Sequence, residues 1–333
     1  MKQLLTTTAV IVAFAVPANA ATLASTFTSF YAFGDSLTDD GKLGTLNAPS
    51  LDGRFSNGEV YAEIIAQKFK QAGLDTGNLA LGGATAGDEN VNAVAPLSTF
   101  GGQVEVFAGS LASGTGLPTA VAPTFEVAPT GPDTGDNPLV SVFFGANDIF
   151  AGQDVIAAAN AVADGIRDLA ALGAQFDDFL VLGLPDIGDT PAFSGSIQAS
   201  AASSAFNGQL LSNISELEAE GLSISYFDTD AVFQEIIASV ENATFEFGIF
   251  DATTPCTVSF SETGPSCLDA GIDPNTLLFG DAVHPSAPAQ ALVADRIIAQ
   301  LEGELSVVPL PASMAFMLFG IAAFGAARMR KAA

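Results

Sequence analysis

Two stretches that lie far apart in the sequence carry residue types that could act together in nucleophilic catalysis. The apolar run Tyr31-Ala32-Phe33 stops at Gly34-Asp35 and is followed by Ser36, which makes Ser36 the candidate nucleophile. Near the other end, His284 stands three residues after Asp281 and is the single histidine among the 333 residues. A serine hydroxyl is activated by an adjacent base, most often an imidazole. If the chain is a serine hydrolase, His284 is its one possible imidazole base.

Two further turns could bring hydrogen-bond donors to the same place. Residues 78–84 form a short apolar run that ends in Gly82 and Gly83, and paired glycines allow a backbone N–H to approach a ligand closely. The continuous apolar run at 139–144 is typical of a strand covered on both faces, and Asn147 follows it. Because ligands bind where parallel strands end, we expect Asn147 to arrive at the same sheet edge as Ser36.

Strand-like and helix-like segments alternate between these turns. The expected strands are the run before Ser36 and the segments 78–84, 139–144, 179–184 and 223–227. The spacing of apolar residues predicts helices at 59–72, 154–172, 199–220, 230–240 and 288–301. This alternation predicts an α/β domain with a parallel sheet and helices on both faces. Residues 86–137 show only a weak helical pattern at 104–111 and are interpreted as an inserted, cap-like segment over the site.

Both ends of the chain have the composition of targeting segments. Residues 1–20 combine Lys2, an apolar stretch and a final Ala18-Asn19-Ala20, which predicts a secretory signal peptide cleaved before Ala21. Residues 305–327 carry no charge and precede a basic end, so they are long enough to span a bilayer. The part between them, residues 21–305, is enough for one α/β domain.

The charge of the chain is strongly acidic. Ten basic and 37 acidic residues give −27, and four of the basic residues lie in the targeting segments, which leaves six minus 37, or −31, for the domain. Such a surface repels nucleic acid and anionic membranes. The sequence contains no HExxH, EF-hand, Walker or dinucleotide pattern, so neither a metal nor a cofactor is expected.

The two cysteines, Cys256 and Cys267, lie in a segment rich in Thr, Ser, Pro and Gly. In an exported protein, an even pair at this spacing is most simply a disulfide. A metal site built from two thiols without a nearby histidine is not expected. The bond would close a polar loop that leads into the turn bearing Asp281 and His284.

Taken together, these motifs resemble the four blocks of the GDSL family of lipases and esterases, also called SGNH hydrolases. Phe33-Gly34-Asp35-Ser36-Leu37 is similar to the first block and residues 78–84 to the second. Gly145-Ala146-Asn147-Asp148 is similar to the third block and Asp281-Ala282-Val283-His284-Pro285 to the fourth. The resemblance covers nearly all of residues 30–300, although 86–137 has no motif that can be aligned. It implies a flavodoxin-like three-layer αβα sandwich with about five parallel strands.

The resemblance also implies a role for each site residue. Ser36 would attack an ester carbonyl, His284 would take its proton, and Asp281 would orient the imidazole and stabilise its cation. The oxyanion would be held by the N–H groups of Ser36 and Gly83 and by the side-chain amide of Asn147, with Gly82 as the alternative to Gly83. The expected function is hydrolysis of carboxylic esters of lipids or of acetylated polysaccharide. Acyl transfer to another acceptor, and a non-catalytic surface or matrix protein that keeps the fold, stay open as alternatives.

The C-terminal tail, residues 306–333, resembles the VPLPA variant of PEP-CTERM sorting signals. Val308-Pro309-Leu310-Pro311-Ala312 is followed by an apolar stretch and a basic end. The resemblance implies export from a Gram-negative bacterium to its surface or matrix, and cleavage near the prolines by a sorting protease of the exosortase type. A permanent membrane anchor is the alternative.

Overall fold

A five-stranded parallel sheet forms the centre of the protein, whose computed structural model describes residues 22–87, 96–122 and 124–306. The strand order is β2-β1-β5-β6-β7, and every pairing is parallel. The strands are β1 (Ser29–Gly34), β2 (Asp75–Asn78), β5 (Pro138–Phe143), β6 (Asp178–Leu182) and β7 (Ser223–Phe227). This order is the flavodoxin-like one, and it confirms the predicted fold.

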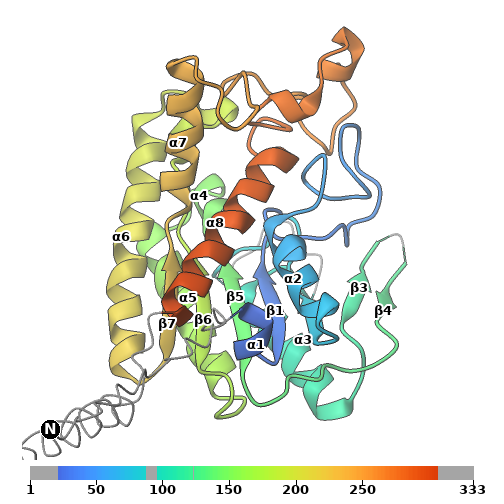
Figure 1. Ribbon diagram of the computed structural model, residues 1–333, viewed down its shortest axis with the longest axis vertical. Coiled ribbons are helices and arrows are strands. Elements are labelled where there is room, and N and C mark those ends of the chain that lie inside the picture. The colour runs from blue at the N-terminus through green and yellow to red at the C-terminus, as the bar shows by residue number, and fades with distance from the viewer. Residues whose placement is uncertain (1–21, 88–95, 123, 307–333) are drawn as a thin grey trace, which may run out of the picture.

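Helices cover both faces of the sheet (Figure 1). One layer contains α1 (Leu23–Thr26), α2 (Tyr61–Gln71), α7 (Thr229–Glu241) and α8 (Ala287–Ser306). The other contains α3 (Phe100–Ser113), α4 (Ala146–Phe150), α5 (Val155–Ala170) and α6 (Ile197–Ala219). Because both faces are covered, β1 and β5 are buried along their whole length, as their continuous apolar runs predict.

The second strand lies earlier in the sequence than predicted. The apolar run at 78–84 was expected to be the strand, but β2 ends at Asn78. Residues after it still follow β1, because the Leu79 and Leu81 N–H groups donate to the Ala32 and Gly34 carbonyls. An edge strand tolerates polar residues on its partly exposed faces, so the polar segment before the apolar run carries the regular pairing.

The segment 86–137 contains a helix that packs into the core. Thr99 caps α3 by accepting the Gly102 N–H at 3.1 Å. The rings of Phe100 and Phe107 are fully buried and lie against Phe33 of β1, with centroids 5.9 and 5.5 Å away. Further along, β3 (Pro118–Ala120) and β4 (Glu126–Val127) form a small antiparallel hairpin. Residues 100–113 are therefore part of the layer that covers the sheet.

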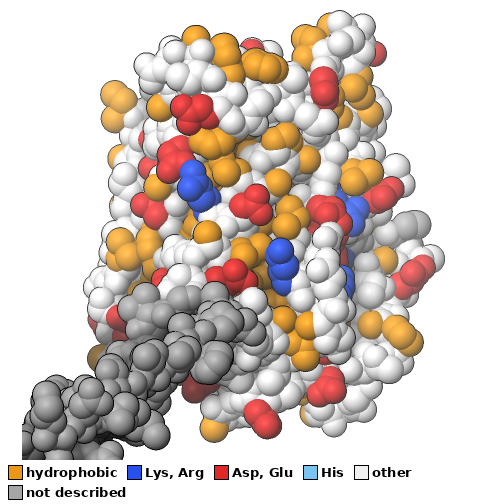
Figure 2. All heavy atoms as spheres, in the orientation of Figure 1, with side chains coloured by type: hydrophobic (Ala, Val, Ile, Leu, Met, Phe, Trp, Pro, Cys, Tyr) orange, Lys and Arg blue, Asp and Glu red, His pale blue; other side chains and the backbone are white. Residues whose placement is uncertain are grey.

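The loops that follow the strands gather at the carboxyl edge of the sheet, which is the upper end in Figure 1. Figure 2 shows acidic side chains scattered over one face of the molecule with few basic ones among them, as the sequence charge predicts. The predicted segments 1–20 and 306–333 fall almost wholly outside the described residues. Within the described part of the chain, no helix is long and apolar enough to cross a membrane.

Candidate active site

Ser36 lies in the turn that follows β1, at the carboxyl edge of the sheet. The turn is tight at Gly34, where a Cβ atom would stand 2.5 Å from Thr38 Oγ1, so that only glycine fits. Asp35 Oδ1 accepts the Leu37 N–H at 3.0 Å and so holds the turn. These contacts fix the direction in which the Ser36 side chain leaves the backbone.

The imidazole of His284 joins this turn to a carboxylate. Nε2 lies 2.8 Å from Ser36 Oγ, and Nδ1 lies 2.8 Å from Asp281 Oδ1. The rings of Phe55 and Phe260 lie beside the imidazole, with centroids 4.8 and 6.0 Å from its own. The structure thus brings three predicted residues from opposite ends of the chain into one hydrogen-bonded series, and packing restrains the ring that connects them.

The carboxylate of Asp281 is buried and surrounded by donors. Besides the imidazole, Oδ1 accepts the N–H groups of Val283 at 3.0 Å and His284 at 2.8 Å, while Oδ2 accepts the Phe260 N–H at 3.1 Å. Burial by itself raises the pKa of Asp281, but the charge and hydrogen bond of His284 and the backbone donors outweigh burial and hold it below the usual value. Asp281 is therefore ionised at neutral pH and can favour a protonated imidazole.

A disulfide joins Cys256 to Cys267, as predicted, and supports the turn that carries Asp281. The chain after Cys256 runs beside that turn and ends near Phe260, whose N–H holds the carboxylate. The backbone bonds between them are Cys256 N–H to Phe279 O, Thr257 N–H to Gly280 O and Ala282 N–H to Val258 O. The cross-linked loop is therefore a direct support of the Asp281 carboxylate.

Asn147 lies in the turn after the neighbouring strand. Gly34 of β1 pairs with Phe143 of β5, so the two strands end at the same level. Asn147 is the second residue of α4, which begins directly after Gly145, whose φ of 119° favours glycine. Its Nδ2 donates to the Ala84 carbonyl at 2.9 Å, which ties α4 to the glycine-containing turn. The third and second sequence motifs are thus in contact at the sheet edge.

The two glycines of that turn lie in different surroundings. The Gly82 N–H donates to Asp39 Oδ2 at 2.8 Å, so it is committed inside the protein. Gly83 has a φ of +82°, and a Cβ atom on it would meet nothing within 4 Å. Asp148 fixes the next residues by accepting the Ala86 N–H at 2.9 Å. The open surroundings of Gly83 are compatible with its predicted role as the oxyanion donor of the pair.

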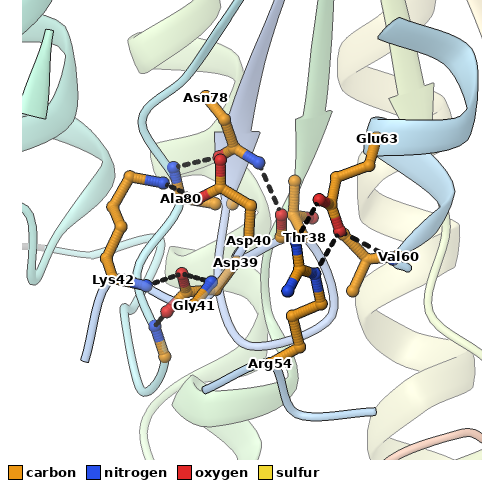
Figure 3. A network of polar contacts seen from close by, with 12 residues as sticks. Thr38, Asp39, Asp40, Gly41, Lys42, Arg54, Val60, Glu63, Asn78 and Ala80 are labelled. Atoms are coloured by element: carbon orange, nitrogen blue, oxygen red, sulfur yellow. Dashed lines mark hydrogen bonds and ion pairs between the residues drawn. The ribbon is translucent and has the colours of Figure 1, made fainter. Parts of the chain in front are cut away.

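Asp39 and Asn78 also support the serine turn, and these roles were not predicted from the sequence (Figure 3). Asp39 accepts the N–H groups of Gly41 and Lys42 as well as that of Gly82, and so links the serine turn to the glycine turn. The Asn78 side chain donates to the Thr38 carbonyl at 2.7 Å. An aspartate two residues before a glycine is an ordinary turn signal. Nothing in that signal reveals the contact with Gly82, which is 43 residues away.

An apolar pocket opens beside Ser36 and His284. Its walls come from α4, the loop after β6, α7 and α8, and its volume is about 40 Å³. The main apolar lining residues are Phe143, Ala146, Phe150, Ile187, Phe233 and Val293. Across the residues that the structure describes, no group of three or more His, Cys, Asp or Glu side chains is placed to hold a metal ion.

Comparison with known families supports the resemblance to the GDSL family that the sequence motifs indicate. The sequence profile of the GDSL-like Lipase/Acylhydrolase family matches residues 30–297, which include all four motifs. The chain belongs to this family.

Two relatives with described activities share a large part of the sequence. The chain is 30% identical over 244 residues to a phosphatidylcholine-sterol acyltransferase of Aeromonas hydrophila, covering 69% of this chain and 65% of the relative. It is 26% identical over 290 residues to the thermolabile hemolysin of Vibrio parahaemolyticus, covering 80% of this chain and 62% of the relative. The alignments thus span a little under two thirds of each relative's length.

The chain is also similar, at low identity, to solved structures of esterases. The match to Est24, a carbohydrate acetylesterase from Sinorhizobium meliloti, has a TM-score of 0.46 at 14% identity. It covers 83% of this chain and 98% of Est24. An aryl esterase of M. Smegmatis has a TM-score of 0.45 at 13% identity, with 83% of this chain and 99% of that one covered.

Proposed function

We propose that this family member hydrolyses carboxylic esters with Ser36 as nucleophile, His284 as general base and acid, and Asp281 as the residue that orients the imidazole. The observation that carries the proposal is the pair of 2.8 Å contacts from His284, one to Ser36 Oγ and one to Asp281 Oδ1. A nucleophile, a base and an orienting carboxylate within hydrogen-bond reach of one another are the geometric signature of acyl transfer through a covalent intermediate.

The reaction follows from this geometry. Ser36 Oγ attacks the ester carbonyl carbon while His284 Nε2 takes its proton, and the buried carboxylate of Asp281 stabilises the resulting imidazolium. The imidazolium then gives that proton to the departing alcohol, which leaves an acyl group on Ser36. Water attacks the acyl-enzyme with His284 again as base, and the acid and free serine are released.

The negative charge that develops on the carbonyl oxygen needs preorganised donors. We assign this role to the N–H groups of Ser36 and Gly83 and to the side chain of Asn147. The Asn147 amide is held in place by its bond to the Ala84 carbonyl, and it has a second N–H to offer. The use of the Gly82 N–H by Asp39 supports Gly83 as the backbone donor of the pair.

The substrates that we propose are esters that an exported enzyme encounters. They are either acyl esters of lipids or acetylated polysaccharide. Acyl transfer to an alcohol instead of water is a second candidate, favoured by the similarity to the phosphatidylcholine-sterol acyltransferase. Both functions use the same acyl-enzyme and differ only in the acceptor. The two 2.8 Å contacts argue against a non-catalytic matrix protein, because a scaffold has no need to keep them.

We also propose that the protein is exported, with residues 1–20 removed and the 306–333 segment recognised by a sorting protease of the exosortase type. The composition of the two ends supports this. Mass spectrometry of the protein isolated from its host tests it: an N-terminus at Ala21 and a C-terminus near Pro309 are expected, and an intact chain would contradict it.

Nitrophenol release from acetyl, butyryl and octanoyl esters by the purified full-length protein tests the enzymatic proposal. We expect turnover that disappears in the Ser36→Ala protein. Adding an alcohol acceptor and analysing the products by chromatography then separates hydrolysis from transfer. Equal rates for the parent protein and the Ser36→Ala protein would exclude Ser36 as nucleophile.

A further inference from the structure

The pocket beside Ser36 and His284 offers a ligand little besides apolar contact. Its other polar lining side chains are those of Tyr61, Thr190, Thr229 and Gln290. None of these four residues is more than 5% exposed. Three of them are hydrogen-bonded within the protein, and the hydroxyl oxygen of the fourth, Thr229, has almost no accessible surface. A group that enters the pocket therefore meets mainly aliphatic and aromatic side chains.

Two stacked phenylalanine rings belong to this apolar surface. Phe150 lines the pocket, is 39% exposed, and is the last residue of α4, three positions after Asn147. Its ring stacks on that of Phe193, with centroids 5.3 Å apart and an angle of 2° between the ring planes. Phe150 thus combines a place at the pocket with aromatic surface that no protein group covers.

The ring pair is held by two parts of the candidate site. Phe193 is the last residue of the short 3₁₀-helix η2 (Pro191–Phe193), in the loop after β6. The Ala192 N–H of this helix donates to the Ala282 carbonyl of the histidine turn at 2.9 Å. Phe150 belongs to the helix that carries the proposed oxyanion donor Asn147. The stack therefore connects α4 to the histidine turn, and the elements that position the site also position the rings.

The chemistry of this surface favours a hydrocarbon chain as the part of the substrate that covers it. Covering exposed aromatic surface with an apolar group is favourable because it removes that surface from water. An acetyl group has a single methyl and covers little. A sugar ring could stack on an aromatic ring, but its hydroxyls need hydrogen-bond partners when they leave water, and the polar side chains of the pocket are bonded or buried. A hydrocarbon chain needs no such partners.

We propose that Phe150, backed by Phe193, is a specificity residue that selects esters with a hydrocarbon chain, such as lipid esters, over acetylated polysaccharide. The chain would leave Ser36 along the apolar lining and contact the exposed part of the Phe150 ring. The inference rests on the proposed function, because it places the ester carbonyl at Ser36. The hydrocarbon chain can belong to the acyl part or to the alcohol part of the ester, and the test distinguishes the two.

The test uses three sets of esters with the full-length protein, at concentrations at which the esters are monomeric. Nitrophenyl acetate, butyrate and octanoate vary the acyl part, and the acetates of ethanol, butanol and octanol vary the alcohol part. Glucose pentaacetate stands for an acetylated sugar. The readout is the ratio of kcat/KM for the longest chain to that for the shortest chain in each series.

The variants are Phe150→Ala, Phe193→Ala and the conservative Phe150→Leu, which keeps an apolar side chain. Phe250→Ala is the matched control. Phe250 is also an exposed phenylalanine in a ring pair, 54% exposed and 5.1 Å from Phe245 between centroids, but it does not line the pocket.

We expect the parent protein to prefer the longest chain in at least one series. Phe150→Ala should lower that ratio about tenfold, which is the effect of about two methylene groups left in water. Phe193→Ala should lower it less, because Phe193 acts by supporting the Phe150 ring. Phe150→Leu should stay within about threefold of the parent, and Phe250→Ala within about twofold. The series in which the ratio falls identifies the part of the ester that carries the chain.

Equal losses of kcat/KM for all chain lengths in Phe150→Ala would overturn the inference, because Phe150 would then only position α4. A loss for glucose pentaacetate larger than that for the longest chains would also overturn it, in favour of a sugar-stacking ring. In both cases Ser36-dependent hydrolysis of nitrophenyl acetate leaves the proposed function standing. If no ester is hydrolysed in a Ser36-dependent manner, the proposed function fails and the inference fails with it.

Discussion

The site is built from two turns that each bury a carboxylate, and the two carboxylates behave in opposite ways. Asp281, in the histidine turn, accepts the imidazole and three backbone N–H groups, and its pKa is lowered. Asp35, in the serine turn, accepts the Leu37 N–H, while its Oδ2 has no partner among the described residues. Burial raises the pKa of Asp35 to about 7, against the smaller opposing effects of Leu37 and His284. Burial alone therefore does not decide whether a carboxylate is charged. The number of hydrogen-bond donors around it does.

The largest expected effect comes from removing the base that connects the two turns. His284→Ala should reduce kcat for butyryl ester hydrolysis by roughly 10⁵-fold or more, because the chain has no second histidine to replace it. Steady-state kinetics on the purified variant measure this. Activity within a hundredfold of the parent would contradict the role of His284, provided that circular dichroism shows an unchanged fold.

Replacing each carboxylate by an amide tests the comparison directly. Asp281→Asn should lower kcat by roughly 10⁴-fold, because an amide N–H would favour the wrong imidazole tautomer. Asp35→Asn keeps an oxygen for the Leu37 N–H and resembles the protonated acid, so its kcat should stay within about tenfold of the parent. The pair is matched in chemistry and burial. Similar losses in the two variants would mean that the turns do not differ in function.

Asn147→Asp tests the proposed oxyanion donor in α4. The variant keeps the shape of the side chain but replaces the amide donor by an acceptor, so kcat should fall by roughly a hundredfold or more. Measuring KM alongside kcat checks that the loss concerns the transition state and not substrate binding. An unchanged kcat would place the oxyanion elsewhere.

The pH dependence of stability should also separate the two carboxylates. With the pKa of Asp35 near 7 in the folded state and 3.8 in the unfolded chain, the unfolded state binds fewer protons between these values, so stability falls as pH rises from about 4 to about 7. The gap of about three units corresponds to roughly 4 kcal/mol. Asp35→Asn lacks this loss, and its melting temperature relative to the parent should rise by several degrees between pH 4.5 and pH 8.

Asp281 should show the opposite dependence. Its folded pKa is lowered, so its contribution to stability is present above the unfolded value near 4 and is lost as the pH falls below it. Asp281→Asn should therefore be less stable than the parent at neutral pH and approach it in acid. Parallel melting curves of both amide variants from pH 3 to pH 8 would contradict the contrast between the turns.

The smallest effect on activity is expected from the disulfide that supports the histidine turn. The Cys256→Ala/Cys267→Ala protein should lose about 3 kcal/mol of stability, from the added freedom of its unfolded chain. Its kcat should fall less than tenfold, because the backbone bonds between 256–258 and 279–282 remain. Denaturant unfolding and kinetics measure the two quantities. An unchanged unfolding midpoint would show that the bond contributes nothing to stability.

Most of the fold and the identities of the site residues could be predicted from the sequence because they depend on local patterns. Buried parallel strands are continuous apolar runs, so four strands appeared near their predicted positions, while the polar edge strand β2 was displaced. Ser36, Asn147, Asp281 and His284 follow such runs or lie in recognisable motifs, and a single histidine admits one base.

Other features depended on contacts between distant segments and emerged only in three dimensions. The link from Asp39 to Gly82, which separates the roles of the two glycines, joins residues with no common pattern. The opposite charge states of Asp35 and Asp281 follow from how many donors the folded chain brings to each carboxylate, which residue type does not reveal. Sequence patterns determined which groups the chain carries, and tertiary packing decided which of them remain available to a substrate.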